Sequence, residues 1–147
     1  MTRPENDRPD RRHRRPPGVD DRTVEAVGKL SEALETTERA RGSLYAFHQL
    51  TGGADLALGE AVDLLRAAGH HTLADRIATE LVGRNVLADR WTFQIVEEYD
   101  NGYYTLFREL EKVVRDELVD GRTHLYEAEM KESRRSHGLP GHEAKPE

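Results

Sequence analysis

Histidine and acidic side chains lie on the apolar faces of several expected helices, where they could together bind a metal. On helical wheels of about 100° per residue, Glu38 and His48 share the apolar face of the first helical segment. Glu98 lies beside the apolar stripe of the third segment, and Glu117 lies on that of the fourth. His124 shares this face if the fourth helix runs through Gly121. Carboxylate and imidazole groups bind iron, manganese and zinc. One interpretation is a divalent metal held in the interior by these five residues.

Two arginines, Arg41 and Arg84, fall on the same inward faces. An unpaired buried charge is costly, so buried arginines need acidic partners. We expect Arg41 and Arg84 to form buried ion pairs with Glu38, Glu98 and Glu117. In this second interpretation the buried charged side chains neutralise one another in ion pairs, and no cofactor is predicted.

The strictest metal hypothesis is a ferritin-like di-metal site, which uses two lone glutamates and two Glu-x-x-His motifs. The chain departs from that pattern. Glu60 is followed three residues later by Asp63, and His124 precedes Glu127 in the reversed order. A ferritin-like metal-binding or oxidoreductase bundle is therefore an alternative, and the only feature that supports it is the expected helical-bundle architecture.

The sequence lacks the common signatures of catalysis. It has no cysteine, which excludes disulfides, thiol enzymes and cysteine-ligated metals. It also has no Gly-x-Ser-x-Gly motif, phosphate-binding glycine loop or His-Glu-x-x-His motif. We therefore expect no catalytic activity.

Charge divides the chain into a basic tail and an acidic body. Residues 1–18 contain six arginines and three acids, whereas residues 19–136 contain 15 basic and 23 acidic residues. An acidic body repels phosphate backbones. Nucleic acid binding is thus expected only weakly, through residues 8–15, and an adaptor that binds polyanions through this tail is a second alternative. The composition predicts disordered tails at 1–18 and 137–147.

Residues 19–136 are expected to form one all-α domain, because no proline occurs between Pro17 and Pro140 and apolar residues recur at helical spacing. We expect an up-and-down antiparallel four-helix bundle. Asp20 or Asp21 caps the first helix. A turn is expected at Asp100-Asn101-Gly102 and a weak point at Gly83. The four expected helices span about 20–50, 54–68, 72–99 and 103–118. Thr51-Gly52-Gly53 is expected to end the first helix and Gly69 the second, and Thr72 is expected to cap the third. Residues 122–135 either continue the last helix or form a fifth.

The third expected helix is apolar on two sides. Val86 and Phe93 project away from Trp91, which lies on the main stripe, and Tyr104 is similarly opposed to the stripe of its own helix. Packing within the chain or contact with another protein would explain this pattern. We prefer an interface formed by Val86, Phe93 and Tyr104, with a homodimer or another protein as partner.

No segment approaches the length of apolar sequence that spans a membrane, and the N-terminus has no secretory signal. We therefore expect a soluble, cytoplasmic protein without a membrane partner. Together the patterns predict a non-catalytic helical-bundle module for interaction or regulation, which self-associates.

Overall fold

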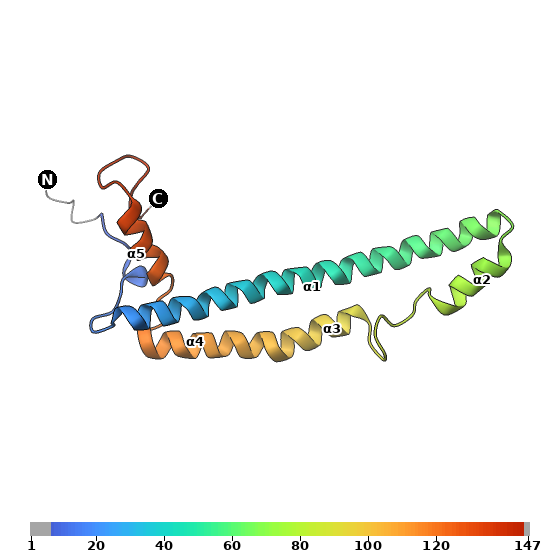
Figure 1. Cartoon of the computed structure of the whole chain (residues 1–147), viewed down its shortest axis with the longest axis horizontal. Coiled ribbons are helices and arrows are strands. Elements are labelled where there is room, and N and C mark those ends of the chain that lie inside the picture. Colours follow the sequence, from blue (N-terminus) through green and yellow to red (C-terminus); the bar gives the residue numbers. More distant parts are fainter. Residues whose placement is uncertain (1–6, 146–147) are drawn as a thin grey trace. The chain divides into compact units, whose positions relative to one another are not determined.

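The computed structural model describes residues 7–145, and these residues are mostly helical with no β-strand (Figure 1). The prediction of an all-α protein is confirmed. None of the helices in this described range combines the length and the apolar character needed to cross a membrane. The elements, in chain order, are η1 (Arg11–His13), α1 (Asp21–Ala67), α2 (His71–Glu80), α3 (Thr92–Tyr99), η2 (Asp100–Tyr104), α4 (Thr105–Val119) and α5 (Leu125–Arg134).

Helix α1 is a single helix of 47 residues. The side chain of Asp20 caps it by accepting a hydrogen bond from the amide of Thr23 at 2.8 Å, as predicted. The predicted break after Leu50 is wrong, because the helix continues through Gly52 and Gly53. Each glycine weakens a helix by only about 1 kcal/mol relative to alanine, and the flanking turns sustain it.

Helix α1 ends where the sequence places its second stop signal. Gly69 has a φ of 89°, and the amide of His70 donates to the carbonyl of Leu65 at 2.9 Å. This left-handed glycine closes the last turn, as predicted. Helix α2 then begins at His71, one residue before Thr72, and the side chain at its cap forms no capping hydrogen bond.

The helix expected over 72–99 is interrupted between α2 and α3. Gly83 has a φ of 70° and Asp89 a φ of 62°, conformations incompatible with a continuous helix. The side chain of Asp55 accepts a hydrogen bond from the amide of Gly83 at 2.8 Å. The weak point in the sequence is therefore a break.

The turn expected at Asp100-Asn101-Gly102 is wrong, because these residues belong to η2, a π-helix that joins α3 to α4 without a break. The hydroxyl of Thr105 donates to the carbonyl of Asp100, which satisfies a backbone group inside the widened turn. π-Helical segments within α-helices are often found at functional sites.

The chain forms a fifth helix after α4. Asp120 and Gly121 have φ values of 55° and 70°, and the amide of Gly121 donates to the carbonyl of Arg115 at 3.0 Å. This arrangement closes α4 at Val119, so residues 125–134 form α5 separately.

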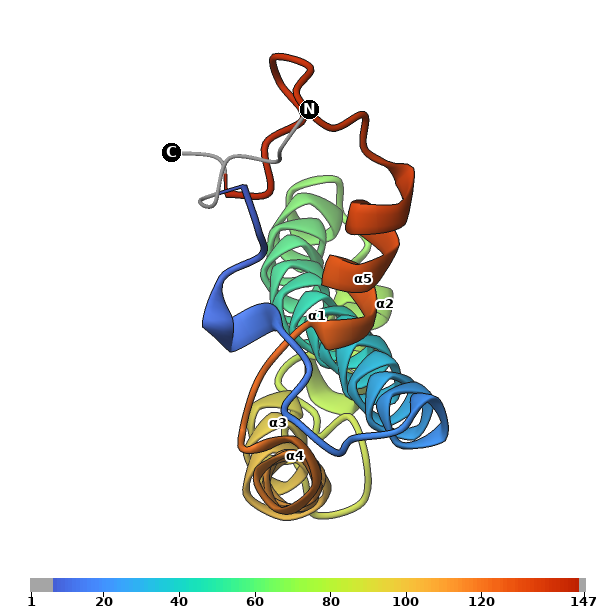
Figure 2. The same cartoon turned by 90° about the vertical axis from the view of Figure 1, so that its left-hand side faces the viewer.

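The chain divides into two compact units. The first unit contains the residues up to Thr36 and those from Leu106 onward. Its apolar core consists of Val24, Val27, Val119 and Leu125. Helix α5 lies across the N-terminal part of α1 (Figure 2). The two helices approach closely, since a Cβ atom built on Gly28 would lie 3.3 Å from the Cβ of Tyr126.

The second unit, residues 37–105, contains the rest of α1 and the chain that returns along it. Its buried apolar residues include Val62, Ala74 and Val96. Hydrogen bonds pair residues of α1, in rising order along the chain, with residues of the returning segment in falling order. The returning segment is therefore antiparallel to α1. These hydrogen-bonded pairs are Glu38 with Tyr104, Arg41 with Asp100, His48 with Thr92, and Asp55 with Gly83.

Candidate functional site

The best-connected polar group of the second unit is an ion pair between Arg41 of α1 and Asp100 of η2. The guanidinium donates from Nε to Oδ1 at 2.7 Å and from Nη2 to Oδ2 at 3.0 Å. The hydroxyl of Tyr45 donates to Oδ2 at 3.2 Å. Both charged side chains are partly buried, with 32% and 23% of their surfaces exposed. The hydrogen bonds from Arg41, and then that from Tyr45, lower the pKa of Asp100.

The inward position of Arg41 follows the sequence prediction, but its partner differs from the expected glutamates. Asp100 was assigned to a turn, so the helical wheel gave it no inward direction. The π-helix supplies that direction. The Arg41 guanidinium also lies over the rings of Tyr45 and Tyr104, 4.9 and 4.7 Å from their centroids.

Glu38 contacts a tyrosine of η2. The hydroxyl of Tyr104 donates to Glu38 Oε1 at 2.6 Å, and Tyr104 is only 8% exposed. Tyr104, which the sequence placed at an interface, is therefore a residue of the interior of the second unit. Its ring also stacks against that of Tyr99, with 6.4 Å between the ring centroids.

The other residues singled out in the second unit have local partners. His48 Nδ1 lies 2.6 Å from the hydroxyl of Thr92, and its ring lies 5.6 Å from that of Phe93. Glu98 pairs with Arg90. Arg84 donates to the carbonyl of Glu80 at 3.4 Å. Each of the three metal ligands predicted in this unit, Glu38, His48 and Glu98, therefore bonds to a different residue.

The first unit contains a buried acid that the helical wheels did not single out. Glu111 of α4 is 6% exposed and accepts hydrogen bonds from Arg115 Nε at 3.0 Å and from the hydroxyl of Ser31 at 3.1 Å. Arg115 also donates to the carbonyl of Gly121 at 2.9 Å. The spacing of Glu111 and Arg115, four residues apart on one helix, was the available signal.

The remaining two predicted metal ligands, Glu117 and His124, are both exposed residues of the first unit. Within residues 7–145, the only three potential ligands that converge are Glu35, His124 and Glu127, whose ligand atoms lie within 4.8 Å of one another. Of the five predicted ligands, His124 alone belongs to this cluster. All three members of the cluster are exposed, and they line a cavity between α1 and the start of α5.

The basic run that the sequence assigned to polyanion binding forms contacts within the first unit. Arg15 pairs with Glu129 at 3.0 Å and with Asp21 at 2.6 Å, and the hydrogen bonds to Glu129 and then to Asp21 raise the pKa of Arg15. His13 Nδ1 lies 2.6 Å from the carbonyl of Thr123. Charge already neutralised by carboxylates is less available to phosphate groups.

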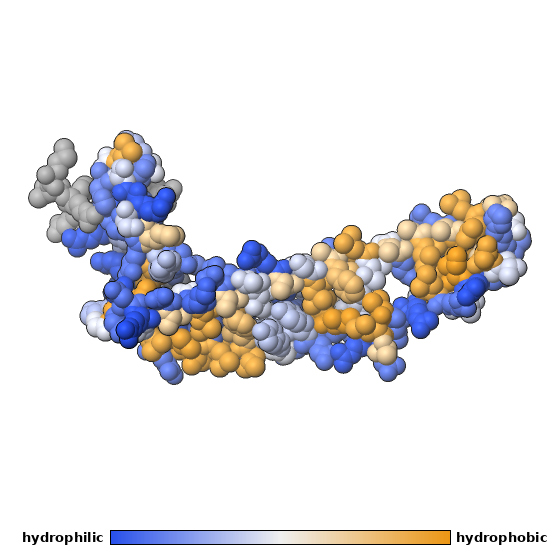
Figure 3. Space-filling model, in the orientation of Figure 1, coloured by the Kyte–Doolittle hydropathy of each residue, from blue (hydrophilic) through white to orange (hydrophobic). Residues whose placement is uncertain are grey.

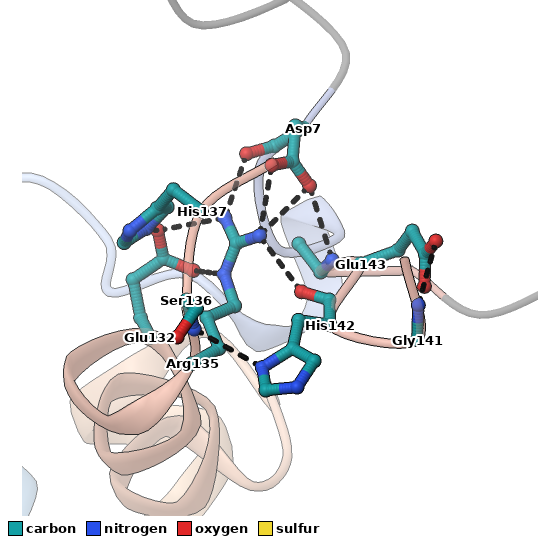
Figure 4. A network of polar contacts seen from close by, with 9 residues as sticks. Asp7, Glu132, Arg135, Ser136, His137, Gly141, His142 and Glu143 are labelled. Atoms are coloured by element: carbon teal, nitrogen blue, oxygen red, sulfur yellow. Dashed lines mark hydrogen bonds and ion pairs between the residues drawn. The ribbon is translucent and has the colours of Figure 1, made fainter. Parts of the chain in front are cut away.

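A second arginine, Arg135, joins the two ends of the described chain (Figure 4). Its guanidinium pairs with Asp7 at 2.8 Å and with Glu132 at 2.7 Å, and it donates to the carbonyl of His142 at 3.0 Å. The hydrogen bonds from Arg135, and then that from His137, lower the pKa of Glu132 to about 2. The disorder expected for residues 1–6, 146 and 147 concerns positions outside the described residues.

Both units expose large apolar side chains (Figure 3). Apolar surface gathers over α4 in the first unit, and over α2 with the C-terminal part of α1 in the second. Of the predicted interface residues, Val86 and Phe93 are 39% and 47% exposed. Other large apolar residues that are mostly exposed include Leu50, Leu56, Leu64, Leu73, Trp91, Tyr103, Leu106 and Leu110.

Comparison with known proteins gives no match: no protein-family model, no curated protein and no solved structure is significantly similar to this chain.

Proposed function

We propose that this protein is a non-catalytic interaction or regulatory module that self-associates, and that an antiparallel helical bundle is completed by a second chain. The observation that carries this proposal is the exposure of large apolar residues in regular helical positions. Contiguous apolar surface of this kind marks interaction sites in proteins.

The four-helix bundle expected from the sequence requires each helix to have two neighbours. Each unit supplies fewer long helices than such a bundle contains. In the second unit, α1 is accompanied by a returning chain that is helical only in parts. A second copy supplies the missing helices, and Val86 and Phe93 belong to the surface that binds it.

The test of this proposal is the mass of the purified full chain in solution. Light scattering should give twice the 16.7 kDa of one chain. Phe93→Asp should reduce the mass toward that of a monomer with unchanged circular dichroism, because a charge at an apolar interface is costly. Phe93→Leu is the matched control and should leave the mass unchanged. A native chain that remains monomeric would contradict the proposal.

The alternative is a divalent-cation site. The convergence of Glu35, His124 and Glu127 favours it, since three protein ligands with water completing the shell are a common arrangement for zinc, and iron or manganese bind the same ligand types. Elemental analysis after expression in metal-replete medium tests it. Stoichiometric metal that is lost in His124→Ala would support this function, and metal-free protein would remove it.

A further inference from the structure

Helix α1 carries a second regular stripe along the face that the second unit leaves uncovered. Its positions alternate by three and four residues and run through Ala40, Ser43, Phe47, Leu50, Ala54, Ala57, Ala61 and Leu64. All eight are exposed, with Phe47, Leu50 and Leu64 at 43%, 73% and 71%. None is charged, although 34% of the residues of the chain are.

This stripe is distinct from the face of α1 that contacts the returning chain. That face contains Arg41, Tyr45, His48 and Asp55, which bond to residues of η2, Thr92 and Gly83. The two faces lie about 140° apart around the helix axis. An alternation of three and four is the spacing of a coiled-coil seam, whose residues pack against a second helix.

We propose that the stripe is the seam of a homodimer in which α1 pairs with α1 of a second copy in antiparallel orientation, with the two-fold axis level with residue 52 along the helix. This inference rests on the proposed self-association and names its partner helix, orientation and register. The seam lies on α1 and does not include Val86 or Phe93, so the separate effects of Leu50→Asp and Phe93→Asp on the dimer distinguish the two surfaces. A two-fold interface must be complementary to itself, so the stripe can be tested for self-complementarity.

In this register, residues equally distant from Gly52 face each other in the two chains, and every large side chain faces a small one. The pairs are Leu50 with Ala54, Phe47 with Ala57, Ser43 with Ala61, and Ala40 with Leu64. Three of the four layers pair a large residue with a small one, which fills space without voids or strain, and the fourth pairs Ser43 with Ala61. The arrangement uses all eight positions of the stripe.

Other pairings of the same stripe fit less well. The antiparallel register shifted by one heptad places Phe47 against Leu64 and Ala54 against Ala57, which crowds one layer and leaves space in another. A parallel pair places each residue against its own copy, so Ala54, Ala57 and Ala61 form consecutive underfilled layers. Size complementarity therefore favours the register centred on Gly52.

Gly53, next to the level of the proposed two-fold axis, is consistent with a close approach of the two α1 helices. A Cβ atom built on Gly53 would meet no atom within 4 Å, so no contact within the chain requires glycine there. Glycine in a helix costs about 1 kcal/mol relative to alanine. Gly53 flanks the stripe between Leu50 and Ala54, where the absence of a side chain leaves room for a partner helix at an interaxial distance of about 8 Å.

The area of the stripe is close to the smallest area that a stable dimer buries per partner. With roughly 200 Å² for a fully exposed large residue, Phe47, Leu50 and Leu64 expose roughly 370 Å². The five small residues add on the order of 200 Å². The total approaches the roughly 600 Å² per partner found at the lower end of stable interfaces.

The seam is tested with two equally exposed leucines of α1. Leu50, at 73% exposure, lies on the stripe, whereas Leu56, at 74%, lies off it. Leu50→Asp should raise the dimer dissociation constant by roughly 100-fold or more, measured by sedimentation equilibrium. Leu56→Asp should leave it within about threefold of the native value. Circular dichroism of both variants reports whether the helices are retained.

Orientation and register are tested by cross-linking, which the absence of native cysteine makes specific. Ser43→Cys and Ala61→Cys are each introduced singly into the full chain, and one variant is tagged so that its mass differs. Oxidised separately, neither variant should form a disulfide-linked dimer. Oxidised after mixing, the two should form the mixed dimer, because the proposed register brings position 43 next to position 61 of the partner.

The outcomes separate this inference from the proposed function. A dimer in which each variant cross-links to itself would show a parallel pair and overturn the inference, while self-association stands. A dimer that forms no mixed disulfide, or one that Leu50→Asp leaves intact, would place the interface elsewhere. A native chain that is monomeric at all concentrations would overturn both.

Discussion

Charged residues of the interior join segments that are distant in the sequence. In the second unit, Arg41 of α1 is neutralised by Asp100 of η2, and in the first unit Glu111 of α4 bonds to Ser31 of α1 as well as to Arg115. Sequence periodicity predicted an inward Arg41, and the structure places its side chain against η2 with 32% of its surface exposed. Periodicity could not select Asp100, because a one-residue expansion of the helix at η2 changes the direction of every side chain within it.

Asp100→Asn should destabilise the protein at neutral pH, since the amide cannot form the charged pair with Arg41. The pKa of Asp100 is lowered in the folded state. The stabilisation is therefore present above the unfolded pKa of about 4 and is lost as the pH falls through the lower, folded value. Urea midpoints of the native and variant proteins should differ at pH 7 and converge on acidification. A constant difference across this range would contradict the assignment.

Glu111→Ala should cost roughly 1 to 3 kcal/mol, because Ser31 loses its acceptor and Arg115 loses its carboxylate partner in a partly buried position. Urea unfolding measures the loss. Glu109→Ala, at an exposed position of the same helix, is the control and should change the free energy of unfolding by less than about 0.5 kcal/mol.

At the scale of elements, the glycines of the chain act in opposite ways. Gly121 has a left-handed backbone that ends α4, whereas Gly42 lies inside α1, where an added Cβ atom would meet no atom within 4 Å. Residue type alone does not distinguish the glycine that ends a helix from the glycine that lies inside one. The helix terminates at the first and continues through the second, because neighbouring residues and tertiary contacts determine whether the backbone can leave the helical region.

Gly121→Ala should therefore destabilise the protein by about 1 to 2 kcal/mol, the cost of a left-handed conformation for a residue with a Cβ atom. That atom would also lie 2.7 Å from Asp116 Oδ1. Gly42→Ala should stabilise by about 0.5 to 1 kcal/mol. Equal effects of the two substitutions on the denaturation midpoint would show that position 121 does not end the helix.

At the scale of the whole molecule, stability should depend on protein concentration. A chain whose apolar seam is covered only by a second copy gains free energy from association. The midpoint of thermal unfolding should rise as the concentration is increased, and this rise should be absent in Leu50→Asp. Differential scanning calorimetry over a roughly hundredfold range of concentration measures it. A midpoint independent of concentration in the native chain would argue that folding and association are uncoupled.

The sequence by itself determined the all-α class, the capping of α1 by Asp20, the stop at Gly69 and the inward face that holds Arg41. These features depend on local spacing and on residue conformational preferences, which act over a few turns. Only the tertiary structure decided that α1 runs unbroken through Gly52 and Gly53, that Asp100 lies in a π-helix beside Arg41, and that Tyr104 is buried. The helix continues through the two glycines because the flanking turns sustain it at a local cost of about 1 kcal/mol per glycine. The positions of Asp100 and Tyr104 depend on their contacts with Arg41 and Glu38, which are far from them in the chain.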